Sequence, residues 1–268
     1  MPPHNAWTER MDAWTWGLAA LAGFGAGLLD SIVGGGGLIM TPAMVNLFPE
    51  WAILNCIATQ RTSSIMGTSV AAGNYFRHVS LPWPVVIAAC AGALPASALG
   101  AMLARKTDPE LLKWLILGMC VVLAVYTFIR KDLGQKHEPR FVGRRQWLAA
   151  GGVGIVTGFY NGVIGPGTGT LMVFAFVSVI GLDFLRSSAV SKAANVAADL
   201  SSWTVLMLGG YVRWAWVLPL IIGNMLGSQI GSRMAILRGS RFIRWVFLGV
   251  VGALTAKVAI DLLIQSQR

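Results

Sequence analysis

Two basic residues, Arg61 and Lys192, fall inside apolar segments of this chain. Arg61 lies about eight residues into its segment, which is roughly 12 Å along a helix. A charge at membrane depth is costly, and such residues usually serve function. We predict that the two cations bind a small oxyanion, with further hydrogen bonds from the nearby polar side chains of Gln60, Ser64, Ser191 and Asn195.

The alternative is that these cations are structural. Arg61 would then pair with Asp30 and Lys192 with Asp199, which would neutralise the charge inside a helix bundle. The two interpretations are compatible, since an acid released from its basic partner when an anion arrives could carry a proton. Asp30 and Asp199 are therefore our candidates for coupling.

Two glycine-rich breaks accompany the cations. Residues 34–37 are four consecutive glycines, and a second break contains Gly165 and Gly167, followed by Thr168. The apolar flanks of the first break, 14–29 and 38–48, would rise only roughly 24 and 16 Å, against a hydrocarbon core of about 30 Å. A helix that starts at such a break directs its free N–H groups and positive dipole end toward an anion. The alternative is a packing hinge without a ligand.

The composition is that of a polytopic membrane protein with an all-α fold. Of 268 residues, 55% are hydrophobic and only 12% are charged, whereas soluble domains carry about 25% charged residues. The formal charge of +10 comes from basic residues gathered in short connections, which indicates membrane orientation and not nucleic-acid binding. No motif of a hydrolase, metalloprotease or ATPase occurs, so we expect no enzyme activity, cofactor or metal.

The chain also repeats itself. At an offset of 131 residues Trp16 aligns with Trp147, Gly34 with Gly165, and Arg61 with Lys192, without a gap. We predict a first transmembrane repeat (1–132), a basic cytoplasmic linker (133–146) and a second repeat (147–268). Paired breaks in such repeats indicate the binding site of a secondary transporter.

Each repeat is expected to hold a glycine-broken helix pair and three transmembrane helices. This odd number would make the repeats inverted, in agreement with the distribution of basic residues. The full segments that we predict are 53–76, 83–104, 111–129, 184–208, 214–234 and 242–263, and the second broken pair is 147–164 and 170–180.

Small residues four apart form faces at Gly223, Gly227 and Gly231, and at Gly92, Ala96 and Gly100. Such faces let helices approach closely. We expect them to pack helices within the chain, with a homodimer as the alternative.

The sequences around both breaks, 27–38 and 158–169, resemble the twin motifs of the TauE/SafE sulfite exporter family. Residues 58–61 are similar to that family's Ala-Thr-Asn-Lys, and 189–195 resemble its Lys-x-x-Asn segment. The resemblance covers nearly the whole chain and implies a bacterial inner-membrane protein that moves small sulfur-containing or organic anions. Arg61, Gln60 and Asn161 depart from the family's common lysine, asparagine and aspartate.

We therefore expect a multi-pass secondary transporter, an exporter of sulfite or a sulfonate, that works by alternating access and is coupled to protons. The expected partners are the anion and the lipid bilayer. The alternatives are a passive anion channel on the same scaffold, or a membrane enzyme or assembly factor without transport.

Overall fold

A computed structural model describes residues 13–107 and 140–266, and all regular elements in these ranges are helical. The predicted all-α class is confirmed. The predicted helix 111–129 and the first half of the basic linker, 133–139, lie outside the described residues. In chain order the elements are α1 (Ala13–Val33), α2 (Gly36–Leu47), α3 (Ile53–His78), α4 (Trp83–Ala104), α6 (Arg144–Val163), α7 (Thr168–Ala175), the π-helix η1 (Phe176–Ile180), α8 (Phe184–Leu208), the 3-10 helix η2 (Trp214–Trp216) and α9 (Val217–Ser266).

Both predicted breaks are present. The chain leaves helical geometry between α1 and α2 at Gly34, with φ +83°, and between α6 and α7 at Gly165 and Gly167, with φ +88° and +82°. These left-handed values favour glycine because a Cβ would clash with the backbone. The glycines therefore divide each apolar stretch into two shorter helices.

Most helix limits agree with the sequence, including those of the last two predicted helices. The segments 214–234 and 242–263 were expected to be separate, and α9 consists of two helices that meet at a kink at Gly239. Gly239 has φ +69° and lies outside helical geometry, so the chain changes direction there without a loop. By length and composition alone, two described helices, α1 and α4, qualify as membrane-crossing.

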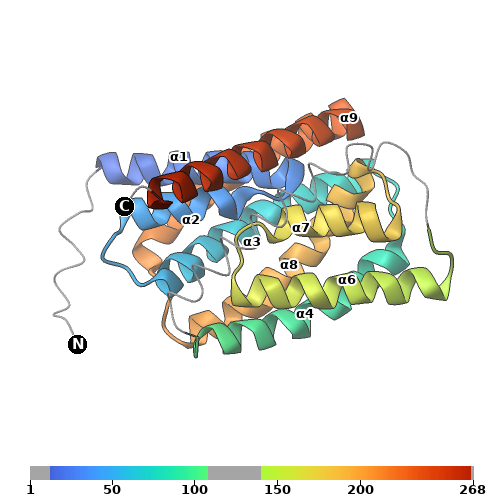
Figure 1. Cartoon of the computed structure of the whole chain (residues 1–268), viewed down its shortest axis with the longest axis horizontal. Coiled ribbons are helices and arrows are strands. Elements are labelled where there is room, and N and C mark those ends of the chain that lie inside the picture. Colours follow the sequence, from blue (N-terminus) through green and yellow to red (C-terminus); the bar gives the residue numbers. More distant parts are fainter. Residues whose placement is uncertain (1–12, 108–139, 267–268) are drawn as a thin grey trace.

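The helices form two groups, each of which combines elements from both sides of the central linker. In the first, which we call the α1 group, α1, α2 and α3 share a hydrophobic core with the start of α9, through residues such as Ala19, Met44 and Leu220. In the second, the α6 group, α6, α7 and α8 share a core with α4, through Val86 and Phe176 among others. Figure 1 shows α4 lying along α6, and the part of α9 before Gly239 packs along α1.

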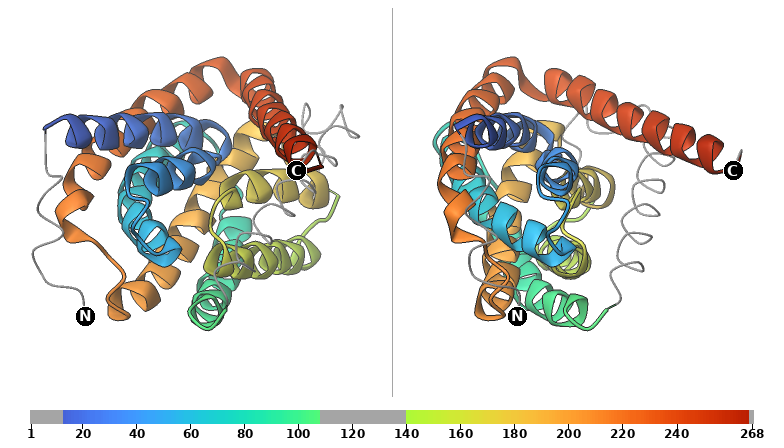
Figure 2. Two further views of the ribbon diagram at one scale, coloured as in Figure 1. Left: turned by 60° about the vertical axis from the view of Figure 1, so that its left-hand side comes forward. Right: turned by 90° about the vertical axis from the view of Figure 1, so that its left-hand side faces the viewer.

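Glycines make the contacts of these long helices close. A Cβ on Gly158 of α6 would come within 2.5 Å of the Ala93 carbonyl oxygen in α4, and one on Gly27 of α1 would overlap the backbone of Asn224 in α9. Gly223, Gly227 and Gly231 of α9 in turn face α1. The small-residue faces thus pack helices within the chain. Beyond Gly239 the second part of α9 leads away from α1, as both turned views in Figure 2 show.

Candidate functional site

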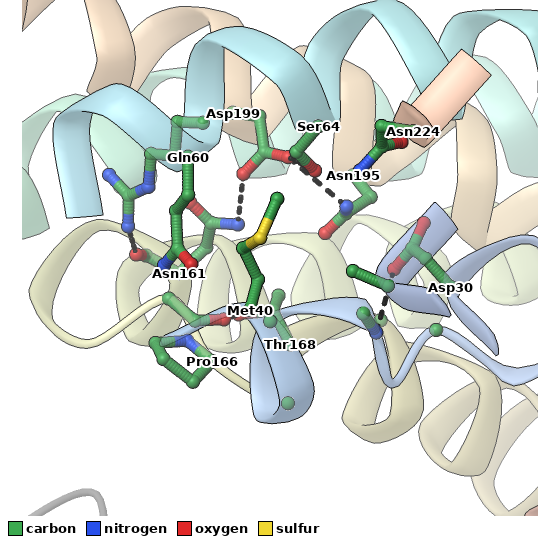
Figure 3. A pocket seen from close by; sticks show the side chains of 18 residues that line it. Asp30, Met40, Gln60, Ser64, Asn161, Pro166, Thr168, Asn195, Asp199 and Asn224 are labelled. Atoms are coloured by element: carbon green, nitrogen blue, oxygen red, sulfur yellow. Dashed lines mark hydrogen bonds between the residues drawn. The ribbon is translucent and has the colours of Figure 1, made fainter. Parts of the chain in front are cut away.

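A pocket lies where the two breaks meet. Its wall includes residues of both breaks, the first residues of α2 and α7, and side chains of α3 and α8 (Figure 3). Its empty volume is about 480 Å³, counting the open mouth. Since α2 and α7 both begin at this wall, the positive ends of two helix dipoles are close to the pocket, which favours an anion there.

Arg61 of α3 supplies the positive side chain of the wall. It is 3% exposed, and its Nη2 donates to the main-chain carbonyl of Asn161, near the end of α6. Gly165 makes room for it, because a Cβ at that position would lie 2.7 Å from Nη2. The other terminal nitrogen, Nη1, is buried and has no hydrogen-bond partner among the described residues. A buried guanidinium with a free donor is a strong candidate to hold an oxyanion.

Lys192 of α8 has a different environment, although it aligns with Arg61 at the 131-residue offset. Its ammonium is fully buried, donates to the main-chain carbonyl of Asp30, and forms an ion pair of 3.2 Å with the Asp30 carboxylate. Lys192 does not belong to the pocket wall. The predicted alternative pairing of Arg61 with Asp30 and of Lys192 with Asp199 is therefore wrong, because Arg61 contacts α6 and Lys192 contacts α1.

Asp199 of α8 accepts hydrogen bonds from uncharged donors. Its Oδ1 accepts from the Asn161 amide at 2.8 Å, and its Oδ2 accepts from Ser64 at 3.0 Å and from Asn195 at 3.3 Å. The side-chain oxygen of Asn195, Oδ1, is itself buried without a hydrogen-bond partner in the described part of the chain. Asp199 and Asn195 thus form a polar side of the pocket next to Arg61.

Gln60 of α3 is held by α2. Its amide and the Thr41 hydroxyl exchange hydrogen bonds of 2.8 and 3.1 Å. In Figure 3 Gln60 and Asn161 lie at one end of the pocket and Asp30 lies at the other. Asp30 is fixed there by Thr68 at 3.0 Å and by the first N–H of α2, that of Gly36, at 3.4 Å.

Most of the predicted site residues meet at this wall. Those present are Gln60, Arg61, Ser64, Asn195, Gly34, Gly36, Gly37, Gly165, Gly167, Thr168 and both coupling candidates, Asp30 and Asp199. Lys192, Ser191 and Gly35 are not part of it. The sequence reasoning missed Ala26, Met40, Asn161, Pro166, Gly169 and Asn224. Asn161 could have been found from its alignment with Asp30, and Asn224 as a polar residue in an apolar segment.

Comparison with known proteins identifies the family of this chain. The family model described as Sulfite exporter TauE/SafE matches residues 19–258 and so includes both breaks, α3 and α8. The chain belongs to the sulfite exporter TauE/SafE family. It is therefore a membrane protein and a membrane transporter.

The names of similar proteins describe transport in general terms and state no substrate. The chain is 31% identical to the probable membrane transporter protein ORF9 of a Sinorhizobium species, over 90% of this chain and 91% of that protein. It is also 31% identical to a probable membrane transporter protein of Haemophilus influenzae (89% and 92% covered) and 30% identical to YfcA of Escherichia coli K12, a probable membrane transporter protein (88% and 86%). No solved structure matches the chain.

Proposed function

We propose that this TauE/SafE protein is a secondary transporter in the inner membrane that exports a small oxyanion, such as sulfite or a sulfonate. The observation that carries the proposal is the free Nη1 of Arg61, a buried guanidinium on the wall of a pocket to which two helix N-termini contribute. Sulfite and sulfonates present several oxygens to a planar donor, which suits arginine better than lysine. The direction of transport follows the description of the family.

The proposal includes alternating access of this site. The pocket lies between the α1 group and the α6 group and takes residues from both. A rearrangement of the two groups could expose it to one side of the membrane at a time. The predicted inverted repeats, and the multi-pass topology that they require, form part of the same proposal.

Ligand-dependent unfolding tests the site. Purified protein in detergent is heated with sulfite, sulfonates, thiosulfate or short carboxylates, and a bound anion at 100 times its Kd should add about 2.7 kcal/mol to the free energy of unfolding. Arg61→Met should abolish this shift, and Arg61→Lys should retain part of it. Arg77→Met, at the exposed end of the same helix, is the matched control. An unchanged shift in Arg61→Met would contradict the proposed site.

Flux measurements test the transport mode. In proteoliposomes, a pH gradient imposed without an anion gradient should drive accumulation of the anion identified by the thermal screen if transport is proton-coupled. A passive channel would only equilibrate that anion. If the internal anion concentration never exceeds its equilibrium value under any imposed proton gradient, the result would favour the channel.

A further inference from the structure

Two carboxylates and one cation line the pocket, a second cation contacts one of these carboxylates from outside it, and all four groups are buried. Asp30, Arg61, Lys192 and Asp199 are between 0% and 7% exposed. With ordinary ionisation their charges sum to zero. A buried cation without a nearby counter-charge is strongly unfavourable at membrane depth, so the anion-free site is stabilised by this balance.

The two breaks achieve the balance in different ways. At the first, Lys192 contacts the Asp30 carboxylate directly at 3.2 Å. At the second, Arg61 contacts only the main chain of Asn161, and the amide of Asn161 donates to Asp199 at 2.8 Å. A neutral residue therefore stands between the cation and the acid.

The positions of the acids explain this difference. At the 131-residue offset Asp30 aligns with Asn161, and Thr68 aligns with Asp199. The contact between the broken helix and its neighbour is present at both sites, as Thr68 with Asp30 and as Asn161 with Asp199. The acid lies on the broken helix α1 at the first site and on the neighbouring helix α8 at the second.

We propose, on the basis of the proposed anion transport, that Asp199 is the counter-ion of Arg61 in the anion-free carrier. Its carboxylate lies on the facing helix α8 and not at position 161, where the alignment with Asp30 would place an acid. This placement leaves the Nη1 of Arg61 free for the substrate, whereas Lys192 is fully engaged by Asp30. The second break thus binds the anion, and the first is a structural ion pair. Asp199 balances Arg61 while the carrier returns empty.

This role separates two transport modes in the variant Asp199→Asn. When an anion is bound, it supplies the charge that Asp199 has lost, so exchange of radiolabelled sulfite between the two sides of a proteoliposome should fall by a much smaller factor than net efflux. Net efflux into sulfite-free buffer requires the empty carrier to return, and an unbalanced Arg61 should slow it by roughly tenfold or more, about 1.4 kcal/mol per factor of ten.

Relocating the charge provides the rescue. Asn161→Asp combined with Asp199→Asn returns a carboxylate to the broken helix and should restore net efflux. Asp183→Asn is the matched control. Asp183 caps the N-terminus of α8, does not line the pocket, and forms an ion pair with Arg186. It should leave exchange and net efflux unchanged.

Stability provides a readout that needs no transport. Asp199→Asn should lower the unfolding midpoint of the anion-free protein, and adding Arg61→Met should restore it, since neither charge then remains. Equal loss of exchange and net efflux in Asp199→Asn, or equal retention of both, would overturn the proposal, as would additive losses of stability in the double variant. Failure of the proposed function would look different: sulfite would not stabilise the wild-type protein, and the wild-type protein would not transport sulfite.

Discussion

The backbone N–H of Thr170 in α7 donates a hydrogen bond of 3.1 Å to the carbonyl oxygen of Gly34. This bond ties the second glycine break to the first, although the two are far apart in the sequence. Space is so limited there that a Cβ on Gly34 would overlap the backbone of Gly169. The pocket wall therefore depends on a backbone contact that only glycine allows.

Replacing Gly34 by alanine should be severely destabilising. The new side chain would overlap Gly169, and the alanine backbone would have to adopt φ +83°. Together these effects should lower the free energy of unfolding by at least about 2 kcal/mol. Gly25→Ala, at an open position of α1, the helix that ends just before Gly34, is the control and should not lower stability. Thermal unfolding followed by tryptophan fluorescence would measure both, and equal midpoints would show that the close contact is dispensable.

The contact between α4 and α6 should be equally sensitive to size. Gly158→Leu would drive a side chain into the Ala93 backbone, while Gly152→Leu adds the same atoms to α6 where nothing lies within 4 Å of the new Cβ. Overpacking typically costs 1–3 kcal/mol, so we expect about that loss for the first variant and little for the second. A comparable loss at both positions would point to a general intolerance of α6 to leucine.

The ion pair between Lys192 and Asp30 should behave as a unit. Lys192→Met leaves the Asp30 carboxylate buried without its cation, which should cost about 3–5 kcal/mol. The double variant with Asp30→Asn removes both charges and should recover much of that loss. A double-mutant cycle of unfolding free energies measures the coupling; a coupling near zero would show that the pair contributes nothing to stability.

Thr41 should influence anion binding without contacting the pocket. It orients Gln60 through two hydrogen bonds, so Thr41→Val should release the amide, cost about 1 kcal/mol of stability and weaken anion affinity severalfold. Thr62→Val is the control on α3, where the hydroxyl contacts Trp203 and the Ala58 carbonyl, away from the pocket wall. Isothermal titration with the anion selected by the thermal screen provides the test, and equal affinities in the two variants would contradict the role of Thr41.

Local features of the fold could be predicted from the sequence. Four consecutive glycines must interrupt a helix, and the glycines at 165 and 167 interrupt the second apolar stretch, so both breaks were found. The apolar runs defined α4 and α8 to the residue. The division expected between 214–234 and 242–263 coincides with the kink at Gly239. Arg61 and Lys192 lie inside α3 and α8, as the apolar segments predicted.

Contacts between distant segments could not be predicted in the same way. An offset aligns Arg61 with Lys192, but it does not say which broken helix each one reaches, and the predicted acid partners were wrong. Nor does it show that Lys192 forms an ion pair with Asp30 while the Nη1 of Arg61 has no partner. These outcomes depend on how helices that are distant in the sequence pack together.

The shared cores have a consequence for the independence of the two halves of the chain. Residues 1–132 expressed alone would contain α4 without α6, and α1 without α9, so each long helix would present its glycine-lined face to lipid. The fragment 147–268 would have the complementary defect. Coexpression of the two fragments should restore a folded protein where either one alone is degraded, because neither polypeptide encloses a complete hydrophobic interior.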